Sequence, residues 1–160
     1  MMKIRKIIAS LLIVATMIPA ICIVSAFADT NDDSYAFVVT TNAFTMITPR
    51  EKGDASPIWV RVDTMTHSSK CKAKAQGNTT SNQFSENWTN YTCSKGVLTD
   101  YVVLNEDVNQ KIHSLIYESG KSYARLGFMG TSGYTYEHLD GWWSADSSHP
   151  ENYISAYKEF

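Results

Sequence analysis

Apolar and polar residues alternate along much of this chain, and the alternation predicts β-strands. In residues 58–63, Ile-Trp-Val-Arg-Val-Asp, the aliphatic side chains share one face, whereas Arg61 and Asp63 lie on the other. A two-residue period is what a strand with one buried and one wet face shows. Residues 35–40 repeat the pattern in a run of β-forming residues. We therefore expect a strand in each stretch.

Further strands are predicted at residues 70–75, 91–94, 97–104, 111–117 and 122–128. In the first of these, lysines alternate with Cys71 and two alanines, so the cysteine faces inward and the lysines face water. Exposed lysines suit an edge strand, because charge discourages pairing with another chain. Gly120, in the stretch Glu118–Lys121, predicts a hairpin turn before the last strand. A short helix over Asn105–Ile116, capped by Asn105, is the alternative for that region.

About seven short strands separated by polar turns are typical of an antiparallel fold. The sequence therefore predicts an all-β, single-domain antiparallel β-sandwich or barrel-like fold. No spacer rich in proline or glycine divides the chain, and about 130 residues are enough for one core. The expected organisation is a signal peptide at residues 1–28, a polar tail at 29–34 and one β domain at 35–160.

The first residues have the pattern of a signal peptide. A basic start at residues 1–6 precedes an apolar run over residues 7–24, and Ala26 and Ala28 form a small-residue cleavage site. We therefore expect cleavage after Ala28 and a secreted, extracellular protein with no stable membrane anchor. A retained transmembrane anchor is the alternative, because the apolar run approaches the roughly 20 residues that span a bilayer.

Cleavage changes the charge of the chain. Of the 14 basic residues, three precede the cut, whereas all 16 acidic residues follow it. The mature protein then carries 11 basic residues and a net charge of −5. A mildly acidic domain does not favour nucleic acid or an anionic bilayer as a partner.

Cleavage also removes Cys22 and leaves two cysteines, Cys71 and Cys93. An even pair in an oxidising compartment predicts a disulfide bond. In the chain-entropy model, a loop of this size stabilises the fold by roughly 3 kcal/mol. Two buried free thiols are the alternative.

Several titratable side chains lie near the C-terminus: Glu137, His138, Asp140, Asp146 and His149. Imidazole and carboxylate groups suit zinc, so a small metal-assisted hydrolase built on His138, Asp140 and His149 is one hypothesis. However, Glu137 and His138 would point to opposite faces of a strand. The sequence also identifies no nucleophile with an oriented base. We therefore predict no catalytic residue, no metal, no cofactor and no enzymatic activity.

Aromatic side chains are the stronger signal in the same region. Tyr134, Tyr136, Trp142 and Trp143 cluster there, and Trp59 precedes Arg61 on an expected outer face. Exposed rings with polar tips stack on sugars or grip a partner protein at low entropic cost. The four C-terminal aromatics are therefore candidate binding residues. The alternative is that one of the two adjacent tryptophans closes the core.

Three short motifs carry a resemblance to a known family: Tyr-x-Phe-Val at 35–38, Tyr-x-Arg-Leu at 123–126 and Gly-x-Trp-Ser-x-Asp-Ser at 141–147. With the basic signal, they resemble small exported proteins of Gram-positive bacteria known as a domain of unknown function. The resemblance implies an exported, single-domain, all-β protein and transfers no catalytic residue. Ala145 stands where a proline is expected. In this resemblance, the last motif forms a closing turn whose aspartate and serines bond to nearby backbone amides.

The leading hypothesis is a secreted, non-enzymatic protein that binds a cell-envelope component or an extracellular protein through some of the C-terminal aromatics. A bacteriocin-like antagonist of a competitor's envelope is the first alternative. The metal-assisted hydrolase is the second.

Overall fold

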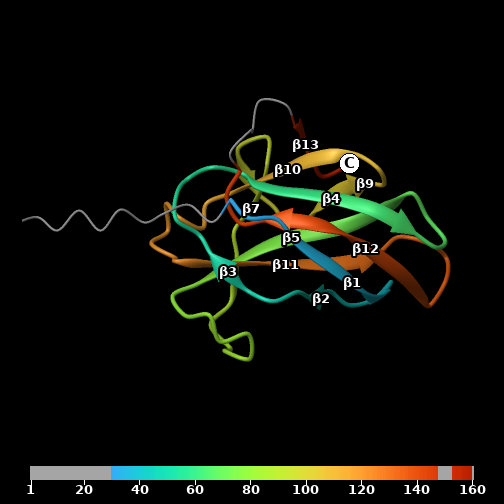
Figure 1. The fold of residues 1–160 in the computed structure, drawn as a ribbon, viewed down its shortest axis with the longest axis horizontal. Helices are drawn as coiled ribbons and strands as arrows, with labels where there is room; N and C mark the ends of the chain where they lie inside the picture. The colour runs from blue at the N-terminus through green and yellow to red at the C-terminus, as the bar shows by residue number, and fades with distance from the viewer. Residues whose placement is uncertain (1–29, 148–152, 160) are drawn as a thin grey trace, which may run out of the picture.

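The computed structural model describes residues 30–147 and 153–159, which form two β-sheets packed face to face (Figure 1). The larger sheet contains β1 (Asp33–Thr40), β12 (Tyr136–Ser144), β4 (Ile58–Met65), β10 (Asn109–Ser114), β7 (Thr92–Ser94), β8 (Val97–Leu98) and β13 (Ile154–Ser155). The smaller sheet contains β2 (Thr45–Met46), β11 (Tyr123–Gly130), β5 (Lys70–Asn78), β6 (Thr89–Asn90), β3 (Arg50–Glu51) and β9 (Val102–Asn105). The strand pairs are antiparallel, except that β13 runs parallel to β10.

The predicted all-β sandwich is confirmed. Alternation along β1, β4 and β11 points one face of each strand into a shared core, which includes Val39, Ile58, Val60, Leu126, Phe128 and Leu139. Rings from opposite sheets meet there, with Tyr35 and Phe128 centroids 5.0 Å apart. Burial of this apolar area is the main contribution to folding. No helix occurs in residues 30–147 or 153–159, so nothing described there could cross a membrane as a helix.

The predicted edge position of the lysine-rich strand is wrong. The lysine-rich strand is not at an edge, because β5 pairs with β11 on one side and with β6 and β9 on the other. Its outward lysines instead cover aromatic rings, with Lys72 Nζ 4.7 Å from the centre of the Tyr101 ring and Lys74 Nζ 4.4 Å from that of Phe44. The aliphatic stems of lysines cover apolar surface while the ammonium groups stay near water.

The predicted turn at Glu118–Lys121 is present, but it does not close a hairpin. Gly120 has a φ of 69°, and Lys121 N donates to Ile116 O over 3.1 Å. The strands before and after it, β10 and β11, lie in different sheets. The alternative helix over Asn105–Ile116 is also absent, since this stretch contains the end of β9, a turn and β10.

The predicted disulfide between Cys71 and Cys93 is not formed in the structure, because both residues are free, buried thiols. Cys71 lies on β5 in the core, whereas Cys93 lies on β7 opposite His113 in the other sheet. Burial raises the pKa of the Cys71 thiol, and the nearby Glu137 carboxylate raises it further. Burial and Glu118 raise the pKa of Cys93 in the same direction. The thiol form is therefore favoured at both sites.

The strand β12, which the sequence reading placed partly in a turn, lies between β1 and β4. Its pairing with β4 shifts register between Asp140 and Gly141, as in a β-bulge. At this point a Cβ atom on Gly141 would lie 2.0 Å from the carbonyl oxygen of Arg61 and 2.7 Å from the Tyr35 hydroxyl. The hydroxyl of Tyr35 donates to the same carbonyl over 2.9 Å. Only glycine permits this close approach.

We predict that Gly141→Ala lowers the free energy of unfolding by at least about 1–3 kcal/mol, the usual effect of overpacking a core. Chemical denaturation followed by circular dichroism measures the change. Gly133→Ala is the matched control, because nothing lies within 4 Å of its added Cβ atom. We expect that control to stay within about 0.5 kcal/mol of the wild type. Equal effects of the two substitutions would contradict the close approach at β12.

We also predict that Cys71 and Cys93 both take up an alkylating reagent when the protein is denatured without reductant. In the native state Cys71 should remain unmodified, since it is fully buried. Peptide mass spectrometry locates the adducts. A disulfide bond would instead protect both cysteines until a reductant is added.

Candidate functional site

The outer face of the larger sheet carries the candidate site. On β4, Trp59, Arg61 and Asp63 alternate with buried residues and point outward. On β12, Trp142 pairs with Arg61, and 44 % of its surface is exposed. Directly opposed residues in antiparallel strands point to the same side, so the indole and the guanidinium are neighbours. Asn109 of β10 pairs with Arg61 from the other side.

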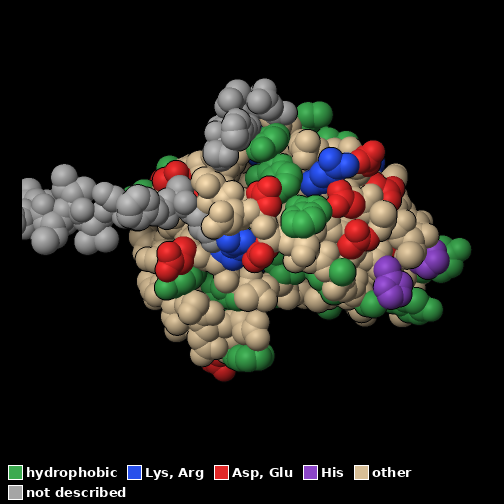
Figure 2. Space-filling view, viewed as in Figure 1, with side chains coloured by type: hydrophobic (Ala, Val, Ile, Leu, Met, Phe, Trp, Pro, Cys, Tyr) green, Lys and Arg blue, Asp and Glu red, His purple; other side chains and the backbone are tan. Residues whose placement is uncertain are grey.

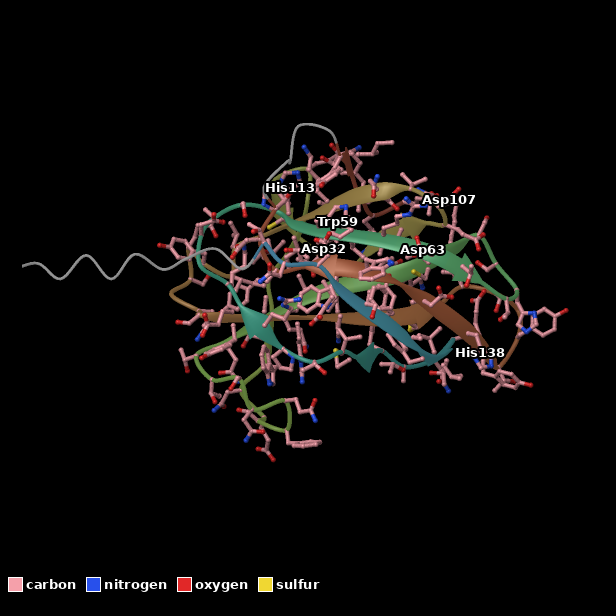
Figure 3. All side chains as sticks on the ribbon, in the orientation of Figure 1. Asp32, Trp59, Asp63, Asp107, His113 and His138 are labelled. Carbon is pink, nitrogen blue, oxygen red and sulfur yellow. The ribbon has the colours of Figure 1, made fainter. Side chains whose placement is uncertain are left out.

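These side chains line a shallow hollow of about 620 Å³, formed by Asp32, Trp59, Arg61, Asp63, Asn109 and Trp142. Figure 3 shows Asp32, Trp59 and Asp63 over the middle of the sheet, with His138 near one end. Apolar, acidic and basic groups lie close together on this face (Figure 2). The hollow therefore offers flat rings beside hydrogen-bonding groups, which is what an amphipathic ligand needs.

Arg61 is held in place by two carboxylates. Its Nε lies 2.7 Å from an oxygen of Asp63, and its Nη2 lies 2.5 Å from an oxygen of Asp107. Trp59 is also held in position by a ring contact, because its ring centroid lies 5.9 Å from that of Tyr153. Side chains fixed in advance lose less conformational entropy when a ligand binds.

The hollow has an acidic balance. Asp32, Asp63 and the neighbouring Asp107 outnumber Arg61, which is the basic residue in the lining. Partial burial raises the pKa of Asp32, and the positive charge of Arg50 opposes this shift. A negative field repels polyanions such as nucleic acids, and an uncharged ligand escapes that repulsion.

The structure divides the four predicted binding aromatics. Trp142 is in the hollow, and Tyr136 lies on the same outer face of β12, with 58 % of its surface exposed. Tyr134 lies beyond the end of β12, where its ring stacks on His67 at a centroid distance of 4.1 Å. The prediction that Trp143 is a binding residue is corrected, because its surface is only 2 % exposed and its side chain belongs to the core. Adjacent residues on a strand face opposite sides, so Trp142 and Trp143 never share a surface.

Sequence reasoning noted Trp59 beside Arg61 but did not include it in the predicted site, and it missed Asp32, Asp63 and Asn109. Alternation in residues 58–63 gives the outward side of β4, which is a local signal. The contributions of Asp32 and Asn109 depend on strand order, and the sequence does not reveal this order.

The hypothesised metal ligands do not converge in the described parts of the chain. No group of three or more His, Cys, Asp or Glu side chains in residues 30–147 and 153–159 has the geometry to hold a metal ion. His138 is exposed on β12, and the Asp140 carboxylate accepts a hydrogen bond from Thr64. His149 lies outside the described residues. As expected, Glu137 is buried on the face opposite to His138, and its Oε1 accepts from His67 N over 3.1 Å.

A second hollow, of about 290 Å³, brings Cys93, His113 and Glu118 to one place. A cysteine beside a histidine is the arrangement of a thiol nucleophile. However, the pKa of Cys93 is raised by burial and by Glu118, whereas an activated thiol needs a lowered pKa. Burial and Lys111 lower the pKa of His113, which favours a neutral ring. This pair therefore lacks the electrostatics of a nucleophile.

The predicted closing turn at residues 141–147 is present only in part, because the residues up to Ser144 belong to β12 and the chain bends after them. Asp146 is fully buried, and its Oδ2 accepts a hydrogen bond from Gly53 N over 2.8 Å. Ser144 Oγ donates to Asp146 O over 2.6 Å, and Ser147 N donates to Ser56 Oγ over 3.1 Å. The carboxylate of Asp146 also contacts the ammonium group of Lys52. Asp146 therefore bonds to a backbone amide, as the motif predicted, whereas Ser144 Oγ bonds to a carbonyl and Ser147 takes part through its backbone N–H.

We predict opposite effects for the two adjacent tryptophans. Trp143→Ala should lower the free energy of unfolding by about 3–5 kcal/mol, because it empties a core site. Trp142→Ala should change it by no more than about 0.5 kcal/mol, as expected of an exposed position. Urea denaturation of both variants tests this difference. A comparable loss in both would place the two rings in the core.

Comparison with known proteins gives a family and no activity. No curated protein and no solved structure matches the chain. One family matches residues 23–147, which is most of the chain. This agrees with the expectation of an uncharacterised family. The chain therefore belongs to the family described as Protein of unknown function (DUF2712).

Proposed function

We propose that this protein is a secreted, non-enzymatic binding protein of a Gram-positive bacterium, and that it recognises an uncharged glycan of the cell envelope. The binding surface is the hollow on the outer face of β4 and β12. The observation that carries this proposal is that Trp59, two residues before Arg61 on β4, and Trp142, opposite Arg61 on β12, line one hollow with the fixed guanidinium.

The chemistry of the hollow favours a sugar. The faces of sugar rings are apolar and stack on indole, while their hydroxyl groups bond to carboxylates, amides and guanidinium groups. Trp59 and Trp142 supply the rings, and Asp32, Asn109 and Arg61 supply the polar groups. The acidic balance argues against anionic envelope polymers, because their charge would be repelled. An uncharged polysaccharide meets both conditions.

Binding without turnover agrees with the shape and the charges of the hollow. Active sites usually exclude water around the reacting groups, whereas this hollow is shallow. The carboxylate of Asp63 is already paired with Arg61, and so is that of Asp107. Neither is a free base for an attacking water molecule.

Export is supported by the signal-peptide pattern of residues 1–28. The net charge of −5 expected after cleavage suits a soluble protein in the medium better than one bound to anionic lipid. The target would then be reached from the outer side of the membrane.

We predict saturable binding of the secreted protein to washed Gram-positive cell walls from which anionic polymers have been removed. Trp142→Ala should weaken it at least about tenfold, the effect of losing a stacking residue at the centre of an interface. Trp59→Ala should act in the same direction. Co-sedimentation gives the dissociation constants, and binding should change little with salt, because the ligand is uncharged.

Phe84→Ala is the matched control, since Phe84 is 85 % exposed and lies outside the hollow. Its affinity should equal that of the wild type. Binding that survives Trp142→Ala in a folded variant contradicts the proposal, and so does binding that needs the anionic polymers. Release of soluble sugars would show an enzyme instead. Growth inhibition of related strains without glycan binding would favour the antagonist.

A further inference from the structure

A buried ion pair lies apart from the proposed binding surface and plays no role in it. Lys52 follows β3 of the smaller sheet, and Asp146 follows β12 of the larger sheet. Their side chains are in direct contact, and the exposed fractions are 1 % for Lys52 and 0 % for Asp146. Residues 94 positions apart thus meet where the two sheets are joined.

The surroundings hold both groups in one arrangement. Lys52 Nζ donates to Ser56 O over 2.6 Å, and Asp146 Oδ2 accepts from Gly53 N over 2.8 Å. A second carboxylate is near, because Asp54 Oδ1 lies 3.7 Å from Lys52 Nζ. Asp54 is itself positioned by a 2.7 Å hydrogen bond from Ser56 N. An amine, a carboxyl group and a second carboxylate are therefore fixed together, and the first two are shielded from water.

The two carboxyl groups have opposite tendencies to hold a proton. Burial raises the pKa of Asp146, although Lys52 and the Gly53 N–H oppose the shift. Partial burial also acts to raise the pKa of Asp54, but hydrogen bonds from Ser56 and Asp146 and the charge of Lys52 bring it below its usual value. A proton that reaches the two carboxyl groups is thus held by Asp146, while Asp54 stays ionised and can take a proton from Lys52 and pass it on. About half of the Asp54 side chain is exposed, so it exchanges protons with solvent.

We propose that Lys52 and Asp146 react with each other to form an intramolecular isopeptide bond between Nζ and Cγ. The ammonium group of Lys52 first gives a proton to the carboxylate of Asp54, which passes it on to the carboxylate of Asp146. The neutral Nζ then attacks Cγ of the protonated Asp146 carboxyl group, and the C–N bond forms. A second proton passes from nitrogen to the departing hydroxyl, the C–O bond breaks and one water molecule leaves. Asp54 is then a carboxylate again, and the ion pair has become one amide and one water molecule.

This reaction needs no external reagent, because the amine, the carboxyl group and the base all belong to the chain. Amide formation from an amine and an acid is slow in water, but the fold holds the two groups in contact. Fixed proximity corresponds to effective concentrations of about 10⁵–10⁸ M in well-oriented intramolecular reactions. Exclusion of water also removes the competing reactant that hydrolyses the product. The bond then ties the end of β12 to the segment after β3.

Peptide mapping of the full-length protein as purified, without any substitution, tests the proposal. Trypsin does not cleave after an acylated lysine, so we expect one branched peptide that joins residues 51–61 to residues 126–158. Its mass is the sum of the two peptides minus one water molecule, and fragmentation places the link at Lys52 and Asp146. If the folded protein yields the two peptides unlinked, with cleavage after Lys52, the pair is an ordinary ion pair and the proposal is wrong.

The ion pair between Lys70 and Glu159 serves as an internal control. Its Nζ–Oε1 distance is 2.7 Å, but both side chains are well exposed, at 46 % and 61 %. We expect no linked peptide there. A link at Lys70 would indicate a nonspecific dehydration during preparation and would overturn the assignment of a specific reaction to the buried pair.

Two variants separate the chemistry from simple contact. Asp146→Asn should still form the link, now with loss of ammonia, and should yield a branched peptide identical in mass to that of the wild type. Asp54→Ala should form the link about 100-fold more slowly, as expected when a general base is lost. Linking at an unchanged rate in Asp54→Ala would remove Asp54 from the mechanism, and an unlinked Asp146→Asn variant that is folded would contradict the amide chemistry.

Discussion

The two-residue period of β12, fixed between β1 and β4, is the constraint on which the rest of the structure depends. It places Leu139 and Trp143 in the core and Trp142 on the surface. A slip by one residue would exchange the two tryptophans and reverse every side chain of the strand. The close contact of Gly141 with the carbonyl of Arg61 opposes such a slip, because a side chain does not fit there. The register of β12 therefore determines both the packing of the core and the residues on the candidate surface.

The same strand connects the hollow to the buried pair. Trp142 lies on the open side of β12, and the strand leads directly into the turn that carries Asp146. The groups of the hollow are mounted on paired strands rather than on long loops, which gives them defined positions. A link between Asp146 and Lys52 would hold the end of β12 against the other sheet. It would thereby secure the strand that presents Trp142.

Local patterns predicted the fold class, but not the arrangement of strands. Alternation in residues 58–63 correctly gave the inward and outward faces of β4. It could not show that the lysine-rich β5 is central, because an outward lysine covering Tyr101 has the same sequence pattern as one at an edge. The candidate site was predicted only in part, because strand order determines which residues meet there. The cluster of aromatic residues near the C-terminus identified Trp142 as a candidate. The position of Asp32 in the same hollow and the contact of Lys52 with Asp146 depend on long-range pairing.

The buried ion pair and the exposed ion pairs differ in what they contribute to stability. Exposed pairs such as Arg61 with Asp107 contribute little to stability and serve mainly to orient the guanidinium. Lys52 and Asp146 are both shielded from water. The desolvation cost of a buried ion pair often exceeds the attraction between its charges, so apolar residues of similar size would make the protein equally stable or more stable. Stability alone therefore does not account for two charged groups at this place. Conversion to an amide removes both charges, and with them the cost of burying them, which makes the covalent product the form best suited to this interior.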